Sequence, residues 1–264
     1  EARRFLVDAY LETAQVENAL KESAPLTEHY LATQDHESAI SLYAKLIEVE
    51  PSNPTLRLTL IQFYDMAGDR ENAAEQWLYL AQLHSRESQW EQAIQAYNKL
   101  LELDESRVEI HYQLAMIYLD KMSNAGEALK QFHRVFELNP GHTEAMSKYI
   151  RMLLRLGKSD LAAKVLQKLE GANPDGAQVR KVVLADFRSR IESEPSDLKA
   201  RFVYGELCYH LGELDLGIEQ FQQTRRDGAF ELRSYNMLGL CFAEKSGFNM
   251  LDLAIKQFRK GLET

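Results

Sequence analysis

A small residue followed four positions later by a large one recurs along this chain. The pairs are Ala39/Tyr43, Ala73/Trp77, Ala93/Tyr97, Ala128/Phe132, Ala162/Leu166, Gly217/Phe221 and Ala254/Phe258. Their small members lie 34, 20, 35, 34, 55 and 37 positions apart. A period near 34 residues indicates a structural unit that is copied, with each copy burying its apolar face against its neighbours. The chain is therefore expected to form a repeat architecture that presents surfaces to partners.

The segment 143–176 shows the repeated unit most clearly. Apolar residues from Met146 to Leu153 recur at spacings of three and four, which predicts one amphipathic helix. Gly157 predicts the end of this helix, because glycine readily adopts the left-handed conformation of a helix C-terminus. A second apolar stripe runs from Leu161 to Leu169, and Pro174 stops it because proline has no N–H to donate inside a helix. The unit is two antiparallel helices joined by a tight turn.

The repeated positions resemble the tetratricopeptide repeat family. The first helix of that family's unit carries a large apolar residue, a leucine, a small residue and an aromatic one; the second carries a small residue, an aromatic one and a closing proline. The clearest copy matches at Met146, Tyr149, Ile150, Leu153, Ala162, Leu166 and Pro174. Other copies match at Trp77, Leu80, Ala81, Ala93 and Tyr97; at Leu114, Ala115, Tyr118, Ala128, Phe132 and Pro140; at Tyr204, Gly205, Cys208 and Phe221; and at Tyr235, Leu238, Gly239, Phe242 and Phe258. The resemblance covers roughly residues 20–264 and implies an all-α fold, a right-handed α-solenoid of about 12–14 helices in antiparallel pairs.

The spacing breaks in two places. The helix expected near residues 70–90 fits two roles, because Trp77 belongs to the second-helix pattern of one unit and to the first-helix pattern of the next. The segment 175–195 fits the second-helix pattern through Val183 and Phe187, with no separate first helix before it. We therefore expect the stack to change direction or phase at both places.

The N-terminal region departs from the pattern in another way, because Pro25 interrupts a segment that should be a first helix. The sequence thus predicts four parts of one continuous solenoid. They are an N-terminal helix plus a degenerate repeat (1–53), regular repeats (54–176), an irregular single helix (177–197) and two C-terminal repeats (198–264).

Charge is unevenly distributed along the chain. The 264 residues carry a formal net charge of −9. Residues 148–190 contain ten Lys or Arg and four Asp or Glu, a local charge of +6 that leaves −15 for the remainder. The overall acidity argues against a nucleic-acid binder. No stretch approaches the roughly 18 apolar residues of a membrane span, so no membrane insertion is expected.

Motifs that carry chemistry are incomplete in this sequence. Gly157-Lys158-Ser159 resembles the end of a phosphate-binding loop, but Met152 stands where that loop needs glycine, and the preceding segment is helical rather than extended. His36-Glu37 lacks the second histidine of a zinc protease, since Ile40 occupies its position. We expect no catalytic, cofactor-binding or metal-binding residues, and no enzyme activity.

The two cysteines, Cys208 and Cys241, lie inside helical patterns and lack metal-binding spacing. Free cysteines fit a reducing compartment, so a cytoplasmic location is expected. The chain begins at Glu1 rather than Met, and we expect it to be a fragment of a longer protein.

In the resembled family, first-helix residues line a concave face, which implies a partner site here. The residues at those positions are Tyr79, Gln82, Tyr112, Gln113, Met116, Lys148, Arg151, Arg155, Phe202, Glu206, Tyr209, Arg233 and Asn236, with Arg188 as an extension of the basic part. Lys148, Arg151 and Arg155 share one helix face at spacings of three and four. Arginine pairs bidentately with carboxylates, which predicts an acidic peptide or helix as partner. The alternative is a solvated face that balances nearby acids.

The sequence therefore predicts a protein–protein interaction scaffold or adaptor segment that binds a peptide or helix of a partner in its concave groove. Two alternatives remain open. The segment is a self-association module that forms homo-oligomers in a larger assembly, or it is a regulatory part of a multidomain protein.

Overall fold

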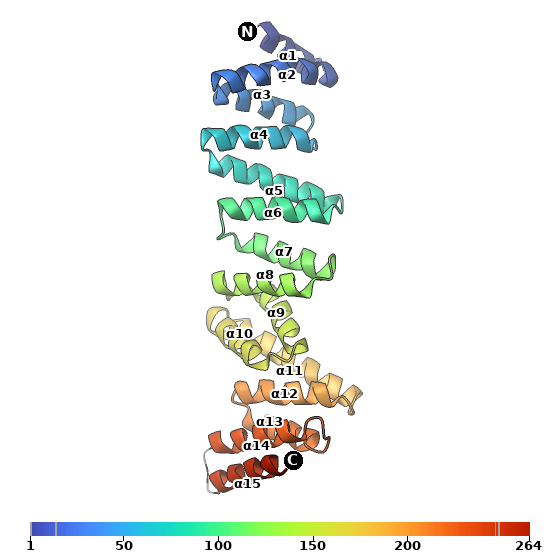
Figure 1. Cartoon of the computed structure of the whole chain (residues 1–264), viewed down its shortest axis with the longest axis vertical. Helices are drawn as coiled ribbons and strands as arrows, with labels where there is room; N and C mark the ends of the chain where they lie inside the picture. Colours follow the sequence, from blue (N-terminus) through green and yellow to red (C-terminus); the bar gives the residue numbers. More distant parts are fainter. Residues whose placement is uncertain (1, 14, 246, 248) are drawn as a thin grey trace. The chain divides into compact units, whose positions relative to one another are not determined.

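The computed structural model describes residues 2–13, 15–245, 247 and 249–264. In these residues the chain forms fifteen α-helices and no strand (Figure 1). This confirms the all-α fold, with one helix more than the upper end of the expected number. The chain divides into two compact units, Glu1–Asn124 and Ala125–Thr264. The division falls inside the part expected as regular repeats.

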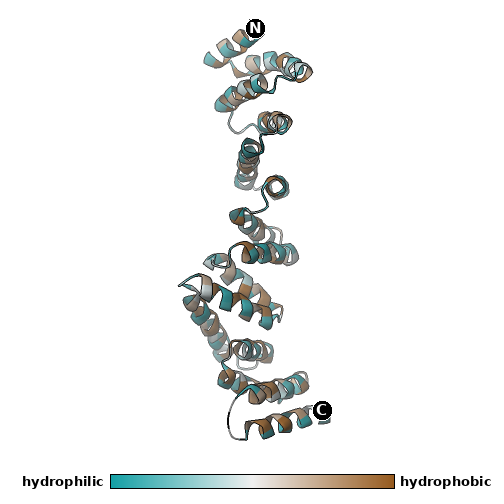
Figure 2. Ribbon diagram, turned by 90° about the vertical axis from the view of Figure 1, so that its left-hand side faces the viewer, coloured by the Kyte–Doolittle hydropathy of each residue, from teal (hydrophilic) through white to brown (hydrophobic). Residues whose placement is uncertain are grey.

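Unit 1 (Glu1–Asn124) is a stack of seven helices in which each helix packs on the next. They are α1 (Ala2–Glu12), α2 (Val16–Thr33), α3 (His36–Val49), α4 (Pro54–Ala67), α5 (Arg70–Arg86), α6 (Trp90–Leu103) and α7 (Val108–Asp120). In Figure 2 the helices carry teal and brown residues on different sides, as expected of amphipathic helices that bury one face.

Unit 2 (Ala125–Thr264) contains eight helices in its described residues, and again each packs on the next. They are α8 (Ala125–Leu138), α9 (Thr143–Arg155), α10 (Ser159–Ala172), α11 (Gly176–Ser193), α12 (Leu198–His210), α13 (Leu214–Thr224), α14 (Glu231–Glu244) and α15 (Met250–Glu263). None of the described helices of either unit combines the length and the apolar character needed to cross a membrane.

The helix α2 continues through Pro25, where the sequence predicted an interruption. Proline removes one helical hydrogen bond, but the residues after it hold the helix by tertiary contact. Leu26 and Tyr30 are buried in a core built from α1 to α4. Thr27 also donates its hydroxyl to the backbone oxygen of Ser23 at 2.8 Å, one turn earlier. Burial therefore outweighs the local preference for a break.

Close packing explains the small residues of the first-helix pattern at Gly205 and Gly239. A Cβ atom added at Gly205 of α12 would lie 2.8 Å from the ring of Phe221 on α13. The same atom at Gly239 of α14 would lie 2.5 Å from the ring of Phe258 on α15. A side chain on the first helix would therefore occupy the space that the aromatic ring of the second helix fills.

The first break in the repeat spacing is a helix with two packing partners. α5 is 17 residues long, against 14 for α4 and for α6. One core cluster joins Leu80 and Ala81 of α5 to Ile61 of α4 and to Ala93 and Tyr97 of α6. The dual sequence pattern thus corresponds to one helix that is longer than its neighbours, and the change of direction or phase expected at this place stays a prediction.

The second break changes which helices lie next to one another in unit 2. The 18-residue α11 contacts α9 as well as α10 and α12. Its insertion places α12 against α10, and α12 in turn contacts α14. By sequence α12 is a first helix and α10 is a second helix, so a first helix continues the row of a second one. The stack changes phase at α11 because one helix is added rather than a pair.

Candidate functional site

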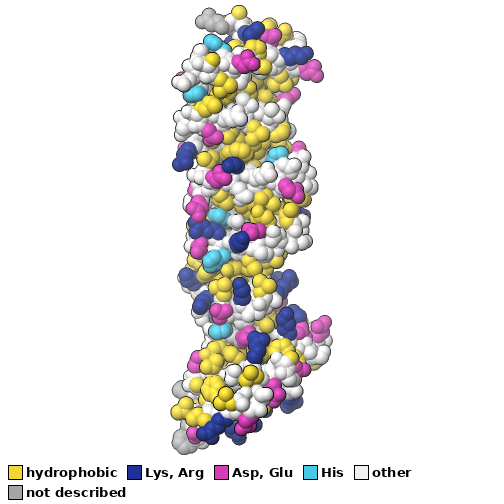
Figure 3. Space-filling model, viewed as in Figure 1, with side chains coloured by type: hydrophobic (Ala, Val, Ile, Leu, Met, Phe, Trp, Pro, Cys, Tyr) yellow, Lys and Arg dark blue, Asp and Glu magenta, His cyan; other side chains and the backbone are white. Residues whose placement is uncertain are grey.

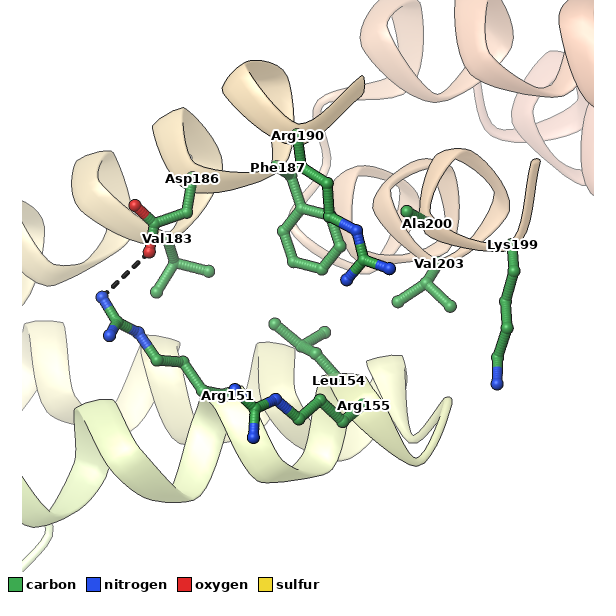
Figure 4. A pocket seen from close by; sticks show the side chains of 10 residues that line it. All are labelled: Arg151, Leu154, Arg155, Val183, Asp186, Phe187, Arg190, Lys199, Ala200 and Val203. Atoms are coloured by element: carbon green, nitrogen blue, oxygen red, sulfur yellow. Dashed lines mark hydrogen bonds and ion pairs between the residues drawn. The ribbon is translucent and has the colours of Figure 1, made fainter. Parts of the chain in front are cut away.

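A cavity of about 330 Å³ opens between α9, α11 and α12 of unit 2 (Figure 4). Its residues are Arg151, Leu154 and Arg155 from α9, Val183, Asp186, Phe187 and Arg190 from α11, and Lys199, Ala200 and Val203 from α12. We call this cavity the basic pocket. The apolar residues form its floor, and four cations with one carboxylate surround them. The lining therefore has a net charge of +3, against +2 for all of unit 2 and −11 for unit 1.

Packing between α11 and α12 fixes the floor of the basic pocket. The ring of Phe187 stacks on that of Tyr204 of α12, with 5.7 Å between centroids and 12° between planes. Next to it, Arg188 donates from Nε to the Tyr204 hydroxyl at 3.0 Å. Burial raises the pKa of Tyr204, so this hydroxyl remains protonated at neutral pH. The two contacts orient α11 so that Phe187 faces the cavity while Arg188 lies outside its lining.

Arg180 holds α11 in place from another side. Its guanidinium contacts Glu170 of α10 at 3.5 Å and Glu213, just before α13, at 2.9 Å. It also donates to the backbone oxygen of Leu211 at 3.4 Å. One half-buried arginine therefore ties α11 to the helix before it and to the turn between α12 and α13.

Two of the pocket cations already hold carboxylates of this chain. Arg190 donates from Nε and Nη2 to Asp197 Oδ2 at 2.9 and 2.6 Å. Asp197 also caps α12 by accepting from the Ala200 N–H at 2.9 Å. This backbone bond, followed by the contact with Arg190, lowers the pKa of Asp197. Arg151 contacts Asp186 at 2.9 Å, but both side chains are more than half exposed, so this pair is weak.

The other two pocket cations are available to a ligand. Arg155 and Lys199 are exposed, and in the described part of the chain neither makes an ion pair within 4.0 Å. Figure 4 shows them on α9 and α12, beside the apolar floor. The two side chains lie on different sides of the pocket, and each is open to an anionic partner without displacement of an internal carboxylate.

The structure gathers only part of the basic strip expected from the sequence. Arg151 and Arg155 line the basic pocket, Lys148 is half-buried on α9 outside it, and Arg188 bonds to Tyr204. Sequence spacing did not identify Arg190 and Lys199, which α11 and α12 contribute. The one useful signal was the position of the basic strip beside the break in the repeat.

The remaining candidates of unit 2 lie on α12 and α14 and do not line the basic pocket. Phe202 is fully buried, with the Arg233 guanidinium 4.3 Å from its ring centroid. Glu206 accepts from Ser159 at 3.2 Å and from Arg233 at 3.3 Å, and burial raises its pKa. Tyr209 donates to Glu244, whereas Asn236 is exposed. Most of these side chains therefore already have partners within the fold.

The candidate residues of unit 1 do not gather at one site. Gln82 and Gln113 line a cavity of about 650 Å³ between α5, α6 and α7. Tyr79 lies under the Arg57 guanidinium, 3.3 Å from its ring centroid. Tyr112 is buried, and Met116 is half-buried on the same helix. The visible surface in Figure 3 intersperses acidic and basic side chains with apolar ones.

Comparisons with known proteins identify the repeat. Models described as "Tetratricopeptide repeat" match residues 28–82 and 121–185, and one described as "TPR repeat" matches residues 85–121. The chain is 24% identical over 215 residues to Tetratricopeptide repeat protein 21A of Homo sapiens. This match covers 81% of the chain but only 13% of the human protein.

Solved structures of helical-repeat proteins are also similar. A crystal structure of MamA protein is 21% identical, covers 72% of this chain and 90% of that one, and has a TM-score of 0.35. The TPR domain of P58(IPK) is 14% identical, covers 99% and 92%, and has a TM-score of 0.37. Scores this low add nothing about function. The three repeat models together cover more than half of the chain, which belongs to the tetratricopeptide repeat family of helical protein-binding scaffolds.

Proposed function

We propose that this chain is a scaffold segment that binds an acidic segment of a partner protein in the basic pocket of unit 2. The observation that carries the proposal is the ring of four cations around an apolar floor. Two of these cations, Arg155 and Lys199, have no internal ion pair among the described residues. Arginine pairs with carboxylates through two parallel hydrogen bonds, and the floor accepts one large apolar side chain. The best ligand is a peptide with a leucine or phenylalanine between acidic residues.

The same lining argues for binding without catalysis. The basic pocket contains no serine, threonine, cysteine or histidine among its described residues, so it offers no common nucleophile beside a histidine base. Its volume lies near the lower end for ligand pockets and suits one side chain with its neighbours. Elsewhere in the unit, burial raises the pKa of the Cys208 and Cys241 thiols to about 12, which keeps both protonated and unreactive. Free buried thiols are compatible with the cytoplasmic location expected from the sequence.

Charge reversal in the basic pocket tests this function. The probe is a fluorescein-labelled short peptide with one leucine flanked by glutamates, titrated with the full chain and followed by anisotropy. The double variant Arg155→Glu/Lys199→Glu is expected to weaken binding by at least about tenfold, because two attractive contacts become repulsive. The wild-type chain should also bind the peptide with glutamines in place of glutamates more weakly.

A matched variant separates the effect of the pocket cations on peptide affinity from the effect of the net charge. Lys164→Glu/Lys181→Glu makes the same change in net charge at exposed sites of α10 and α11 outside the lining. It should leave the affinity within about twofold at moderate salt. Equal losses in both double variants, or no binding of the probe to the wild-type chain, would contradict the proposal.

Self-association is a second candidate, favoured by one apolar face of α15. Leu251, Ile255 and Leu262 share this face and are 68%, 42% and 87% exposed. An exposed apolar stripe of this kind is suited to packing against another protein surface, and a second copy of the chain offers one. Light scattering of the full chain over a range of concentrations should then show a dimer, which Leu251→Glu/Leu262→Glu converts to a monomer. A wild-type chain that stays monomeric at high concentration excludes this candidate.

A further inference from the structure

A second cavity adjoins the basic pocket along α9 and α11. It has a volume of about 180 Å³ and is lined by Thr143, Ser147 and Arg151 from α9, by Asp175 just before α11, and by Gln178, Val179, Val182 and Val183 from the first half of α11. We call it the valine pocket. Arg151 and Val183 line both cavities, so the two are contiguous. The valine pocket has a different chemistry, with one acid, one base, uncharged polar groups and three valines.

The two pockets follow one another along a pair of parallel helices. Residues 143–151 of α9 line the valine pocket with residues 175–183, at and just before the start of α11, and residues 151–155 line the basic pocket with residues 183–190. The numbers rise together on both helices, so α9 and α11 run in the same direction. The pockets are offset by seven to eight residues of α11, about 11 Å or two helical turns.

The Arg151–Asp186 ion pair lies where the pockets meet. Arg151 belongs to both linings, and its guanidinium reaches across from α9 to Asp186 of α11 at 2.9 Å (Figure 4). Both partners are more than half exposed, so water competes with the pair and breaking it costs little free energy. Asp186 is also the only carboxylate in the described lining of the basic pocket.

We infer, building on the proposed function, that the ligand is an amphipathic acidic helix of a partner protein that spans both pockets. Its apolar side chains lie two turns apart, one on the valines and one on the floor of the basic pocket. A carboxylate one turn between them takes the place of Asp186 on Arg151. Asp186 is thus a specificity-determining residue: it occupies Arg151 in the free protein and repels the ligand carboxylate until that carboxylate displaces it.

Three observations support a helix as the occupant. The spacing of the pockets matches apolar residues at positions i and i+7 of a helix, the pattern of helices that bind in grooves. Both pockets are lined by the same two parallel helices, so they follow one line along α9 and α11. The basic end of the groove complements the acid of the ligand, while the valine end needs no charge.

Two peptides distinguish this inference from the proposed function. The one-anchor peptide is the leucine-and-glutamate probe described above. The two-anchor peptide carries leucines two helical turns apart with a glutamate between them, and is stapled to hold it helical. Binding of the one-anchor peptide tests the basic pocket alone. A tighter complex with the two-anchor peptide, by about tenfold, is expected if the valine pocket is also filled.

Two substitutions test the separate parts of the inference. Asp186→Asn should bind the two-anchor peptide about three- to fivefold tighter, and this gain should vanish for a peptide with glutamine in place of the central glutamate. Val182→Lys should weaken binding of the two-anchor peptide about tenfold and leave the affinity for the one-anchor peptide unchanged. Glu192→Gln on α11 and the exposed Leu156→Lys are the matched controls outside both linings, and neither should alter either affinity.

The outcomes separate cleanly. If both peptides bind equally and Asp186→Asn changes neither affinity, while Arg155→Glu/Lys199→Glu still weakens binding at least about tenfold, the basic pocket is supported and the spanning helix is wrong. If neither peptide binds the wild-type chain, both proposals fail. A gain with Asp186→Asn that persists for the glutamine peptide would show that Asp186 acts by a route other than a ligand carboxylate.

Discussion

Replacement of Phe221 by alanine is expected to lower the free energy of unfolding of unit 2 by about 3–5 kcal/mol. The ring of Phe221 is fully buried. It fills the space over Gly205 and meets the ring of Phe202 edge-on, with 5.4 Å between centroids and 61° between planes. Gly205 has no side chain that can expand into the vacated volume, so a cavity would remain. Urea unfolding of the full chain, followed by circular dichroism, measures the loss.

The small partner of this pair provides the internal control. Gly205→Ala forces a Cβ atom to within 2.9 Å of two ring carbons of the fully buried Phe221 and should cost about 1–3 kcal/mol. In a Phe221→Leu background the same substitution should cost clearly less, because the shorter side chain leaves space. A double-mutant cycle measures this coupling. Additive effects, or a loss below about 1 kcal/mol for Phe221→Ala, would contradict the packing described here.

Substitution of Gly176 by alanine is expected to be the second most damaging change, at about 2–3 kcal/mol. A Cβ atom at this position would lie 2.6 Å from the Cα and N atoms of Glu170 and 2.8 Å from the carbonyl carbon of Leu169. These are backbone atoms of α10, so the clash cannot be relieved by turning a side chain. The start of α11 must move away from α10, which also displaces Phe187 from the basic pocket. Urea unfolding and the affinity for the one-anchor peptide should therefore decline together.

A nearby glycine should respond in the opposite direction. Gly171 lies inside α10, and a Cβ atom there would meet nothing within 4 Å. Gly171→Ala is thus expected to stabilise the protein by about 0.5–1 kcal/mol through helix propensity, with no change in peptide affinity. Equal stability of the two variants would show that the close approach at Gly176 is not a constraint on α11.

Local rules predicted most of the helices from the sequence. Gly68, Gly157 and Gly212 take up left-handed φ angles of 74°, 70° and 79° at helix ends, because only glycine enters that region without a steric penalty. Pro25 shows where such rules stop. The local preference favoured a break, but the buried Leu26 and Tyr30 after it keep the helix intact, and burial depends on neighbours that spacing does not reveal.

The candidate site was accessible to sequence reasoning only in part. Arg151 and Arg155 were found because residues four positions apart share a helix face. Arg190 and Lys199 come from two other helices, and their convergence depends on the packing of α12 against α10. The burial of Phe202 was also hidden, because it results from contacts with Phe221 and Phe230 across helices rather than from its own position in the repeat. Long-range packing decided each of these outcomes.

The phase change at α11 has a consequence for the numbering of repeat positions. First and second helices alternate along the chain, and duplication of a whole 34-residue unit preserves this alternation. A single extra helix reverses this alternation. The row that contains α10, a second helix by sequence, continues through α12 and α14, which are first helices by sequence. A surface that follows this row therefore presents second-helix positions before the reversal and first-helix positions after it. Consensus mutagenesis planned from the repeat motif should be assigned separately on the two sides of α11.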